Sequence, residues 1–426
     1  MDDILAHEAI PNYFGRRMRG MLSMSTMVLW TTTLFLLSLV CYGPFRYYMA
    51  KFGLAEFVYI PKILLFIMIP FMISYIGRAS KALIIGGAIV TLFAGWGMVE
   101  LPSLDQSLFG VWVIIPLLYG LLSAHYFFNN TNAYKKIFVI LFIIALSGVL
   151  INVFVQYPWV GASFKIGGEE VQISRRWWAF GISRIGGFSG ASFDAAIQIM
   201  FFSVWLMFVI NSNAIKVLVW IASGVGVTLT TTKGVLGAYL ILTTFFISGK
   251  VFGHKLLWRQ IWVLLLLANL SLLVFLPLST VIIHYNPTFH GYFDRFIFAS
   301  FGDRLNYTWP ASFGLLHHDV GWLFGRGIGG IGTPQTYFEP SNALPADNLY
   351  VYLAVDLGPI LAAVILIAIC LKAARSFLRT NDASLMFSIL VFLIAYGMVV
   401  NIVEAPILSL FFGVVIGRLF QKDREV

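Results

Sequence analysis

Residues 260–283 read QIWVLLLLANLSLLVFLPLSTVII, a stretch without a single charged side chain. A helix needs about 20 apolar residues to cross the roughly 30 Å hydrocarbon core of a bilayer. Comparable stretches recur along the chain and predict spans near 23–44, 57–77, 82–99, 108–128, 137–157, 194–211, 216–232, 234–249, 260–283, 348–371, 384–402 and 405–420. We therefore predict an all-α polytopic membrane protein with about 12 transmembrane helices.

The overall composition supports this class. The chain is 59% hydrophobic and 11% charged, with a mean hydropathy of +0.87, outside the range of a soluble globular domain. We therefore expect residues 1–426 to form a single integral membrane domain. Cys41 and Cys370 both lie inside apolar stretches, so we expect no disulfide framework. The first stretch is long and lacks a small-residue cleavage site, so we expect an uncleaved anchor.

The positive charges predict the orientation of the chain, because short cytoplasmic loops collect lysine and arginine. Of the 28 lysines and arginines, 17 fall on one predicted side: Arg16, Arg17, Arg19, Arg78, Lys81, Lys135, Lys136, Lys216, Lys250, Lys255, Arg259, Lys372, Arg375, Arg379, Arg418, Lys422 and Arg424. Both termini are then cytoplasmic. The net charge of +9 mainly reflects this bias, and we predict no nucleic-acid partner.

Two long segments, 158–193 and 284–347, face outward in this orientation, and we expect short amphipathic helices in them. Both collect positive charge where it is normally scarce, namely Lys165, Arg175, Arg176, Arg184, Arg295, Arg304 and Arg326. Guanidinium groups suit two-pronged contacts with phosphate, which indicates an anionic substrate. Alternatively, these side chains reach lipid headgroups or pair with Glu169, Glu170, Asp294 and Asp303.

Four ordered motifs resemble a known family. Residues 184–190 are RIGGFSG, 230–237 are TTTKGVLG, 323–329 are LFGRGIG after Arg304 and Trp309, and Asp347-Asn348-Leu-Tyr is followed by Asp356-Leu-Gly358. In order and position these resemble segments of the O-antigen ligase and Wzy-type polysaccharide polymerase superfamily. The resemblance covers roughly residues 180–360.

The resemblance implies transfer of a sugar from an undecaprenyl-diphosphate carrier at the outer face of the bacterial inner membrane, without metal or cofactor. The family's ligases typically carry histidine at the position of Asp347, whereas Lys233 keeps the positive charge of its counterpart. This departure favours an exopolysaccharide or O-antigen polymerase over a ligase that acts on a lipid core. We expect membrane lipid, a chain-length regulator and a flippase as further partners.

The chemistry of such a transfer fits the residues. Cations stabilise the departing diphosphate, and a carboxylate or histidine accepts the proton of the acceptor hydroxyl. We therefore predict Asp347, Arg304 and Arg184 as catalytic residues. For substrate binding we predict Arg175, Arg176, Lys233, Arg295, His317, His318, Arg326, Asn348 and Tyr350, and we see no His/Cys cluster at metal-ligand spacing.

Several residues have a structural alternative. Asp347 precedes an apolar stretch and is suited to cap a helix, with or without a catalytic role. Glycines 325–330 form a turn or cradle a phosphate. Leu305, Trp309, Phe313 and Leu316 follow helical spacing and predict an interfacial helix on the membrane. Lys233 either contacts substrate or pairs with Asp356.

The sequence leaves three other functions open. A secondary transporter commonly has two similar halves and a site near the midplane, and neither is visible here. A lipid-linked oligosaccharide flippase binds the same ligand but has little use for a long outer loop. A structural or signalling membrane protein is the third alternative.

Overall fold

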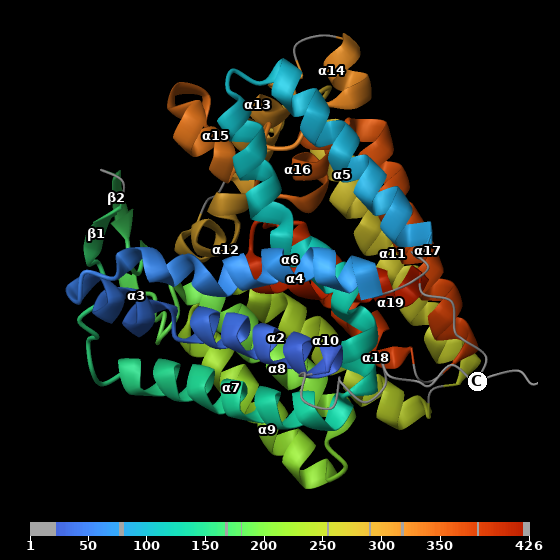
Figure 1. The fold of residues 1–426 in the computed structure, drawn as a ribbon. Helices are drawn as coiled ribbons and strands as arrows, with labels where there is room; N and C mark the ends of the chain where they lie inside the picture. The colour runs from blue at the N-terminus through green and yellow to red at the C-terminus, as the bar shows by residue number, and fades with distance from the viewer. Residues whose placement is uncertain are drawn as a thin grey trace, which may run out of the picture.

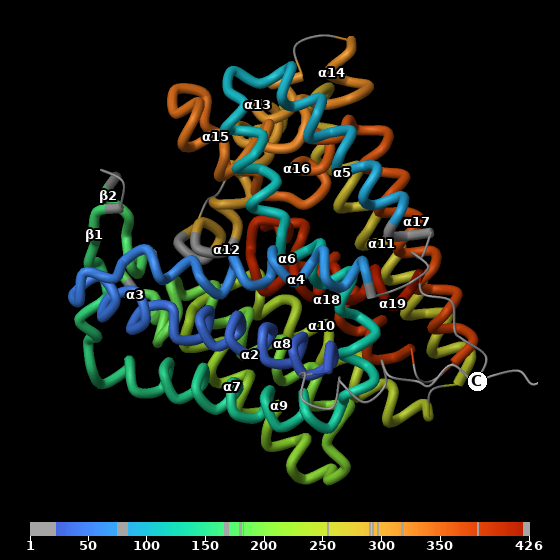
Figure 2. The backbone as a smooth tube through the Cα atoms, in the orientation of Figure 1, coloured from blue at the N-terminus to red at the C-terminus, as the bar shows by residue number. Residues whose placement is uncertain are grey.

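The computed structural model describes residues 23–75, 81–166, 169–179, 181–253, 255–288, 291–316, 319–380 and 383–420. Helices account for most of this chain, and four short strands form two hairpins (Figures 1 and 2). The helices are α2 (Met24–Val40), α3 (Tyr42–Lys51), η2 (Ala55–Tyr59), α4 (Ile60–Tyr75), α5 (Lys81–Glu100), α6 (Leu104–Asn129), α7 (Thr131–Asn152), α8 (Ser192–Val209), α9 (Asn213–Leu229), α10 (Lys233–Phe252), α11 (Leu256–Ser279), α12 (Tyr292–Asp303), η3 (Arg304–Thr308), α13 (Trp309–Gly314), α14 (Asp319–Phe324), α15 (Thr333–Phe338), η4 (Pro340–Asn342), α16 (Leu349–Leu357), α17 (Pro359–Arg379), α18 (Ser384–Gly397) and α19 (Pro406–Phe420).

The chain is a multi-pass membrane protein. Within the described ranges, seven helical segments are long and apolar enough to cross a bilayer: Ala55–Ser74, Leu104–Asn129, Thr131–Asn152, Ser192–Val209, Lys233–Phe252, Leu256–Ser279 and Pro359–Arg379. The bent pair α2 and α3 makes an eighth candidate, and four further apolar helices are shorter. Each of the twelve predicted stretches therefore contains a helix, but fewer than twelve reach full spanning length.

Two predicted stretches are interrupted. The first, 23–44, bends by 85° between α2 and α3. The stretch 348–371 is divided at Gly358 into α16 and α17. Gly358 has φ +84°, and a Cβ there would collide with the backbone carbonyl of Leu323. A side chain is therefore excluded on both conformational and steric grounds.

Three helix ends that the charge pattern assigns to one side lie close together. At one end, Asn130 after α6 donates to Ser25 of α2 (2.6 Å), and Arg418 of α19 lies over the Phe128 ring (5.5 Å). The start of α2 and the end of α19 therefore lie at the same end of the bundle. The side of the membrane on which that end lies stays a prediction.

The first long segment lies at the opposite end of the bundle and forms hairpins, so the helices expected there are a wrong prediction. Strands β1 (Ser163–Ile166) and β2 (Glu169–Gln172) pair antiparallel, as do β3 (Trp178–Ala179) and β4 (Ile182–Ser183). Figure 1 shows β1, β2 and α3 together at the left of the molecule. Alternating polar and apolar residues such as Phe164-Lys165-Ile166 suit a half-exposed strand better than a helix face.

The second long segment contains the short helices that the sequence predicts, α12 to α15. The helical spacing of Leu305, Trp309, Phe313 and Leu316 is also confirmed, but these side chains are buried in the protein core and do not lie on the membrane surface. Helix α13 contacts α16, and the Phe313 ring lies 5.9 Å from Trp322 of α14 and 6.5 Å from Tyr350 of α16. The segment is therefore built into the bundle.

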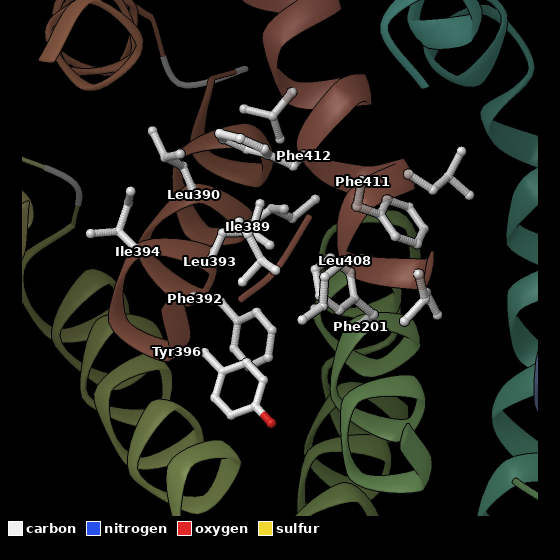
Figure 3. Packing of buried hydrophobic residues seen from close by; sticks show 14 of the residues in the cluster. Phe201, Ile389, Leu390, Phe392, Leu393, Ile394, Tyr396, Leu408, Phe411 and Phe412 are labelled. Carbon is white, nitrogen blue, oxygen red and sulfur yellow. The ribbon is translucent and has the colours of Figure 1, made fainter. Parts of the chain in front are cut away.

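The centre of the bundle is formed by α6, α8, α18 and α19. Phe201 of α8 packs against Phe392 of α18 and Phe411 of α19, with ring centroids 5.0 and 4.7 Å away (Figure 3). Helices α6 and α19 approach so closely that a Cβ on Gly120 or Gly413 would collide with a facing backbone carbonyl. Small residues allow such contact between membrane helices, which makes this pair a rigid support.

Candidate functional site

Arg304 connects three segments at the outer part of the bundle. It begins η3, a π-helical turn, a feature that often marks functional sites. Its Nη1 donates to the Ser300 carbonyl (2.8 Å) and its Nη2 to the Val399 carbonyl (3.0 Å). The same Nη2 lies 3.3 Å from the Asp347 carboxylate, and the exposed fractions of the two side chains are 16% and 39%. The predicted catalytic residues Arg304 and Asp347 therefore form an ion pair that solvent still reaches.

The cap of α16 is Asn348, so the expectation that Asp347 caps this helix is wrong. The Asn348 side-chain oxygen accepts from Val351 N (3.0 Å), and its amide donates to the Met398 carbonyl (3.2 Å). Asn348 is buried and its polar atoms are used within the protein. Asp347 is thereby left without a capping role, and its side chain turns to Arg304.

The environment of Asp347 favours proton uptake. Burial raises the pKa of the Asp347 carboxyl above its usual value, and the Arg304 charge opposes this rise. A carboxylate with a raised pKa that is still accessible is suited to act as a general base. The geometry is thus compatible with the catalytic role predicted for Asp347.

Arg184 and Lys233 approach this pair from other elements. Arg184 follows β4, and Lys233 is the first residue of α10; the two lie close enough to repel each other electrostatically. A Cβ on Gly234 would come within 2.9 Å of the Tyr396 ring and 3.0 Å of Val399. The start of α10 is therefore packed against the segment that also receives Arg304.

Tyr396 lies at the centre of this group. Its hydroxyl is within electrostatic range of Arg184, Arg304, Asp347 and Asp194. In Figure 3 the hydroxyl points away from the labelled apolar side chains of the core. We call Arg184, Lys233, Arg304, Asp347 and Tyr396 the outer polar cluster. Residues from five regions of the chain converge in it, and cations outnumber carboxylates.

The remaining predicted site residues lie outside the outer polar cluster or form hydrogen bonds within the protein. Arg175 and Arg176 are exposed on the first loop, and Arg295 is exposed on α12. The Tyr350 hydroxyl donates to the Pro359 carbonyl (3.3 Å), and the ring is buried. His317 and His318 lie outside the described residues.

Arg326 is held by a buried partner. Its Nη2 is 3.0 Å from both carboxylate oxygens of Glu339, and its Nη1 donates to the Gly330 carbonyl (2.7 Å). Among the residues that the structure describes, the ion pairs are this one and Arg304–Asp347. The alternative pair of Lys233 with Asp356 is not among these ion pairs: Lys233 lies near Arg184, and the Asp356 carboxylate accepts from Gly330 N (3.1 Å).

Glycines 325–330 form a tightly packed turn, which was one of the two expectations for them. The amide of Gly327 donates to the Asp356 carbonyl (3.0 Å), and that of Ile328 to the Phe93 carbonyl (3.0 Å). Gly327 and Gly329 have φ of +84° and +94°, and a Cβ on either would collide with α5 or α6. Because these amides bind within the protein, the turn positions Arg326 and does not offer a phosphate cradle.

Sequence reasoning missed Tyr396 and Asp194. Asp194 had a signal, since it is an ionisable residue at the edge of the apolar stretch 194–211, where such groups are usually functional or paired. Tyr396 had none, because a tyrosine in an apolar helix is ordinary. Across the described ranges, no three His, Cys, Asp or Glu side chains come together as a metal site.

Comparisons of the chain with protein-family models, curated proteins and solved structures find no match. The family resemblance therefore depends on the motifs quoted above, and the geometry of the outer polar cluster is independent of it.

Proposed function

We propose that the protein is a glycosyltransferase that polymerises undecaprenyl-diphosphate-linked oligosaccharide repeat units in exopolysaccharide or O-antigen synthesis. It acts at the periplasmic face of the bacterial inner membrane, with both termini cytoplasmic. The observation that carries the proposal is the convergence of three cations and one carboxylate in the outer polar cluster. This composition suits a reaction that expels a diphosphate and accepts a proton.

The proposed step is a direct displacement. A hydroxyl oxygen of the incoming repeat unit attacks C1 of the first sugar of the growing chain, from the face opposite the diphosphate. The new C–O bond forms as the bond from C1 to the diphosphate breaks, so C1 is inverted. The hydroxyl proton passes to Asp347, and the electron pair leaves with the diphosphate.

The residues divide this work between them. Arg184 and Lys233 stabilise the departing negative charge. The Arg304 guanidinium is bonded to Asp347 and to two backbone carbonyls. Its main role is therefore to orient the base, and its positive charge also helps to stabilise the departing diphosphate. No step requires a metal ion, and metal independence stays part of the proposal.

Deletion of the gene followed by sizing of the lipid-linked glycan tests the reaction. Polymerase loss leaves single repeats on the carrier, whereas ligase loss leaves long lipid-linked chains. Proteoliposomes distinguish the third possibility, because a flippase moves the ligand across the membrane without forming a bond. Accumulation of long chains, or transport alone, would contradict the proposal.

The role of Arg184 is tested in the same strain. Arg184→Lys keeps the charge but loses the two-pronged guanidinium contact, so polymer should fall at least about tenfold at equal protein level. Arg176→Lys is the matched control, because Arg176 lies on the same loop and is exposed. Near-normal polymer from Arg184→Lys would remove Arg184 from the site.

A further inference from the structure

Three segments that are far apart in sequence bring tyrosines together near the outer polar cluster. Tyr42 begins α3, Tyr59 ends η2 and Tyr337 lies in α15. The Tyr42 hydroxyl is within electrostatic range of both other tyrosines, and each of the three side chains is at least partly exposed. Figure 1 shows α3 and α15 on the same side of the molecule. We call Tyr42, Arg46, Tyr59 and Tyr337 the tyrosine–arginine patch.

Arg46 lies one turn after Tyr42 on α3, and its guanidinium rests on the tyrosine rings. The guanidinium carbon is 4.0 Å from the centroid of the Tyr42 ring and 5.9 Å from that of the Tyr59 ring. An aromatic face attracts a cation within about 6 Å, so both rings hold the guanidinium in place. In the described part of the chain, Arg46 has no carboxylate at ion-pair distance, and its side chain donates no hydrogen bond. A positioned cation therefore keeps all of its N–H donors for a ligand.

Asp194 connects the patch with the outer polar cluster. A Cβ on Gly190 would lie 2.9 Å from the Tyr42 ring and 3.4 Å from the Asp194 Oδ2 atom, so the ring and the carboxylate pack around the same glycine. Asp194 is also within electrostatic range of Tyr396 in the cluster. A ligand that extends from the cluster past Asp194 therefore meets Tyr42 and Arg46.

The composition of the patch suits a sugar that carries a carboxylate. The C–H faces of a sugar ring pack on aromatic rings, while its hydroxyls bond to polar groups at their edges, as the Asp194 carboxylate and the tyrosine hydroxyls allow. A guanidinium without a partner in the protein favours an anion, and its planar fork matches a carboxylate.

The position of the patch decides which part of the substrate reaches it. In the proposed reaction, the departing diphosphate lies at Arg184 and Lys233. The diphosphate of the incoming repeat unit is separated from the attacking hydroxyl by the rest of that oligosaccharide. Because the patch adjoins the cluster, the anion that meets Arg46 belongs to the attacking sugar or to its neighbour.

We infer that the tyrosine–arginine patch is the subsite for the incoming repeat unit, in which the tyrosines pack on its terminal sugars and Arg46 is the specificity-determining residue that binds a carboxylate on one of them. The repeat unit then contains an acidic sugar, such as a uronic acid, at or next to its non-reducing end. This inference rests on the proposed function, because it takes the acceptor of that reaction as the ligand.

The test measures how tightly the purified full-length protein in detergent binds a free oligosaccharide. Mild acid releases this oligosaccharide from the lipid-linked single repeats of the deletion strain, so it carries neither the lipid nor the diphosphate. Reduction of its carboxylates to alcohols should weaken binding to the wild-type protein about tenfold, because a charge-assisted contact is lost. Arg46→Gln should bind the native and the reduced oligosaccharide equally weakly, and Arg46→Lys should keep part of the difference.

Two further variants separate the tyrosines from the charge. Tyr59→Leu should weaken binding of the native and the reduced oligosaccharide alike, because it removes a ring on which a sugar packs. Lys51→Gln is the matched control for Arg46→Gln, since Lys51 is an exposed cation at the end of the same helix. It should bind both oligosaccharides as the wild-type protein does.

The outcomes distinguish this inference from the proposed function. Equal binding of native and reduced oligosaccharide by the wild-type protein overturns the inference while the polymerase stands, and so does wild-type binding by Arg46→Gln. Both results are expected if Arg46 meets only lipid headgroups. A repeat unit without an acidic sugar overturns the inference as well. Absence of single lipid-linked repeats from the deletion strain contradicts the proposed function instead, before any binding is measured.

Discussion

Asp347 and Asn348 are neighbours with different tasks, and the difference follows from where each side chain can reach. Asn348 is buried at the start of α16, where its oxygen satisfies a free backbone amide. Asp347 is one residue outside the helix and meets Arg304 in a partly exposed position. Substitutions of Asp347 therefore test the proposed chemistry, and substitutions of Asn348 test the stability of the helix.

Asp347→Asn should abolish polymer formation while leaving the melting temperature of the detergent-solubilised protein nearly unchanged. The substitution keeps the shape of the side chain but removes its basicity, and the helix cap is on Asn348. Sized lipid-linked glycan and thermal melts measure the two effects. An active Asp347→Asn variant would falsify the assignment of the base and direct attention to Asp194.

The pH dependence of polymer formation by the wild-type protein gives an independent test of the proposed base. A base acts only when deprotonated, so activity should be lost as the pH falls through the pKa of Asp347. Since burial raises that pKa, the acid limb should lie above the usual aspartate range. If activity is instead lost within the usual aspartate pKa range, the base is a more solvated carboxylate than Asp347.

Asn348→Ala should have the opposite signature. Loss of the cap and of the contact with the Met398 carbonyl should lower the free energy of unfolding by about 1–2 kcal/mol. Asn348→Ser is the matched comparison, because its hydroxyl can still accept from the Val351 amide and places no charge beside the Met398 carbonyl. Equal stability of Asn348→Ala and wild type in thermal melts would show that the cap is dispensable.

At the scale of elements, the glycine turn 325–330 is held between helices that are distant in sequence. Trp96 of α5 donates to the Gly325 carbonyl across 229 positions, and Gln106 of α6 donates to the Gly329 carbonyl across 223. The second long segment, 284–347, is therefore fixed to the bundle at its centre. Its glycines are needed because backbone meets backbone there.

Gly110→Ala should destabilise the protein by about 1–3 kcal/mol, because its new Cβ would lie 2.6 Å from Gly329 N and neither backbone can yield cheaply. Gly95→Ala on α5 is the matched control, since a Cβ there meets nothing within 4 Å. Helix propensity alone should make that variant neutral or slightly more stable. Similar melting temperatures for the two variants would contradict the packing argument.

The sequence predicts features that depend on neighbouring residues better than features that depend on contacts between residues far apart in the chain. Apolar runs alone predict the helices, because spanning a bilayer requires them. The Arg326–Glu339 pair crosses an irregular segment, and the break at Gly358 depends on a backbone contact with Leu323. No local pattern encodes such contacts. The same limit separates Arg304, which motif resemblance indicated, from Tyr396, which only tertiary packing brings to the site.

At the scale of the whole molecule, the orientation in the membrane determines which chemistry is reachable. The hairpins and α12 to α15 must face outward for a periplasmic reaction, and the positive-inside pattern predicts that they do. The structure adds surface positions on both sides that can be labelled. Ser183 and Ser341 are exposed in the two long segments, and Asn213 is exposed at the start of α9.

Ser183→Cys and Ser341→Cys should react with an impermeant thiol reagent in intact spheroplasts, and Asn213→Cys only after the membrane is opened. The background carries Cys41→Ala and Cys370→Ala, which removes both native thiols. The charge pattern is the reason for this expectation. The reverse labelling pattern would place the outer polar cluster in the cytoplasm and end the periplasmic proposal.

The long reach of the glycine turn also has a consequence for biogenesis. The ribosome releases α5 and α6 more than two hundred residues before the turn that fills the space against them. Until then Gly97 and Gly110 lack the turn residues Ile328 and Gly329 that pack against them in the structure. Arg304 and Asp347 flank that turn in sequence, so the site is assembled last, after most helices have entered the bilayer. A chain that ends before residue 304 would thus retain α2 to α11 and lack Arg304, Asp347 and Tyr396 of the outer polar cluster.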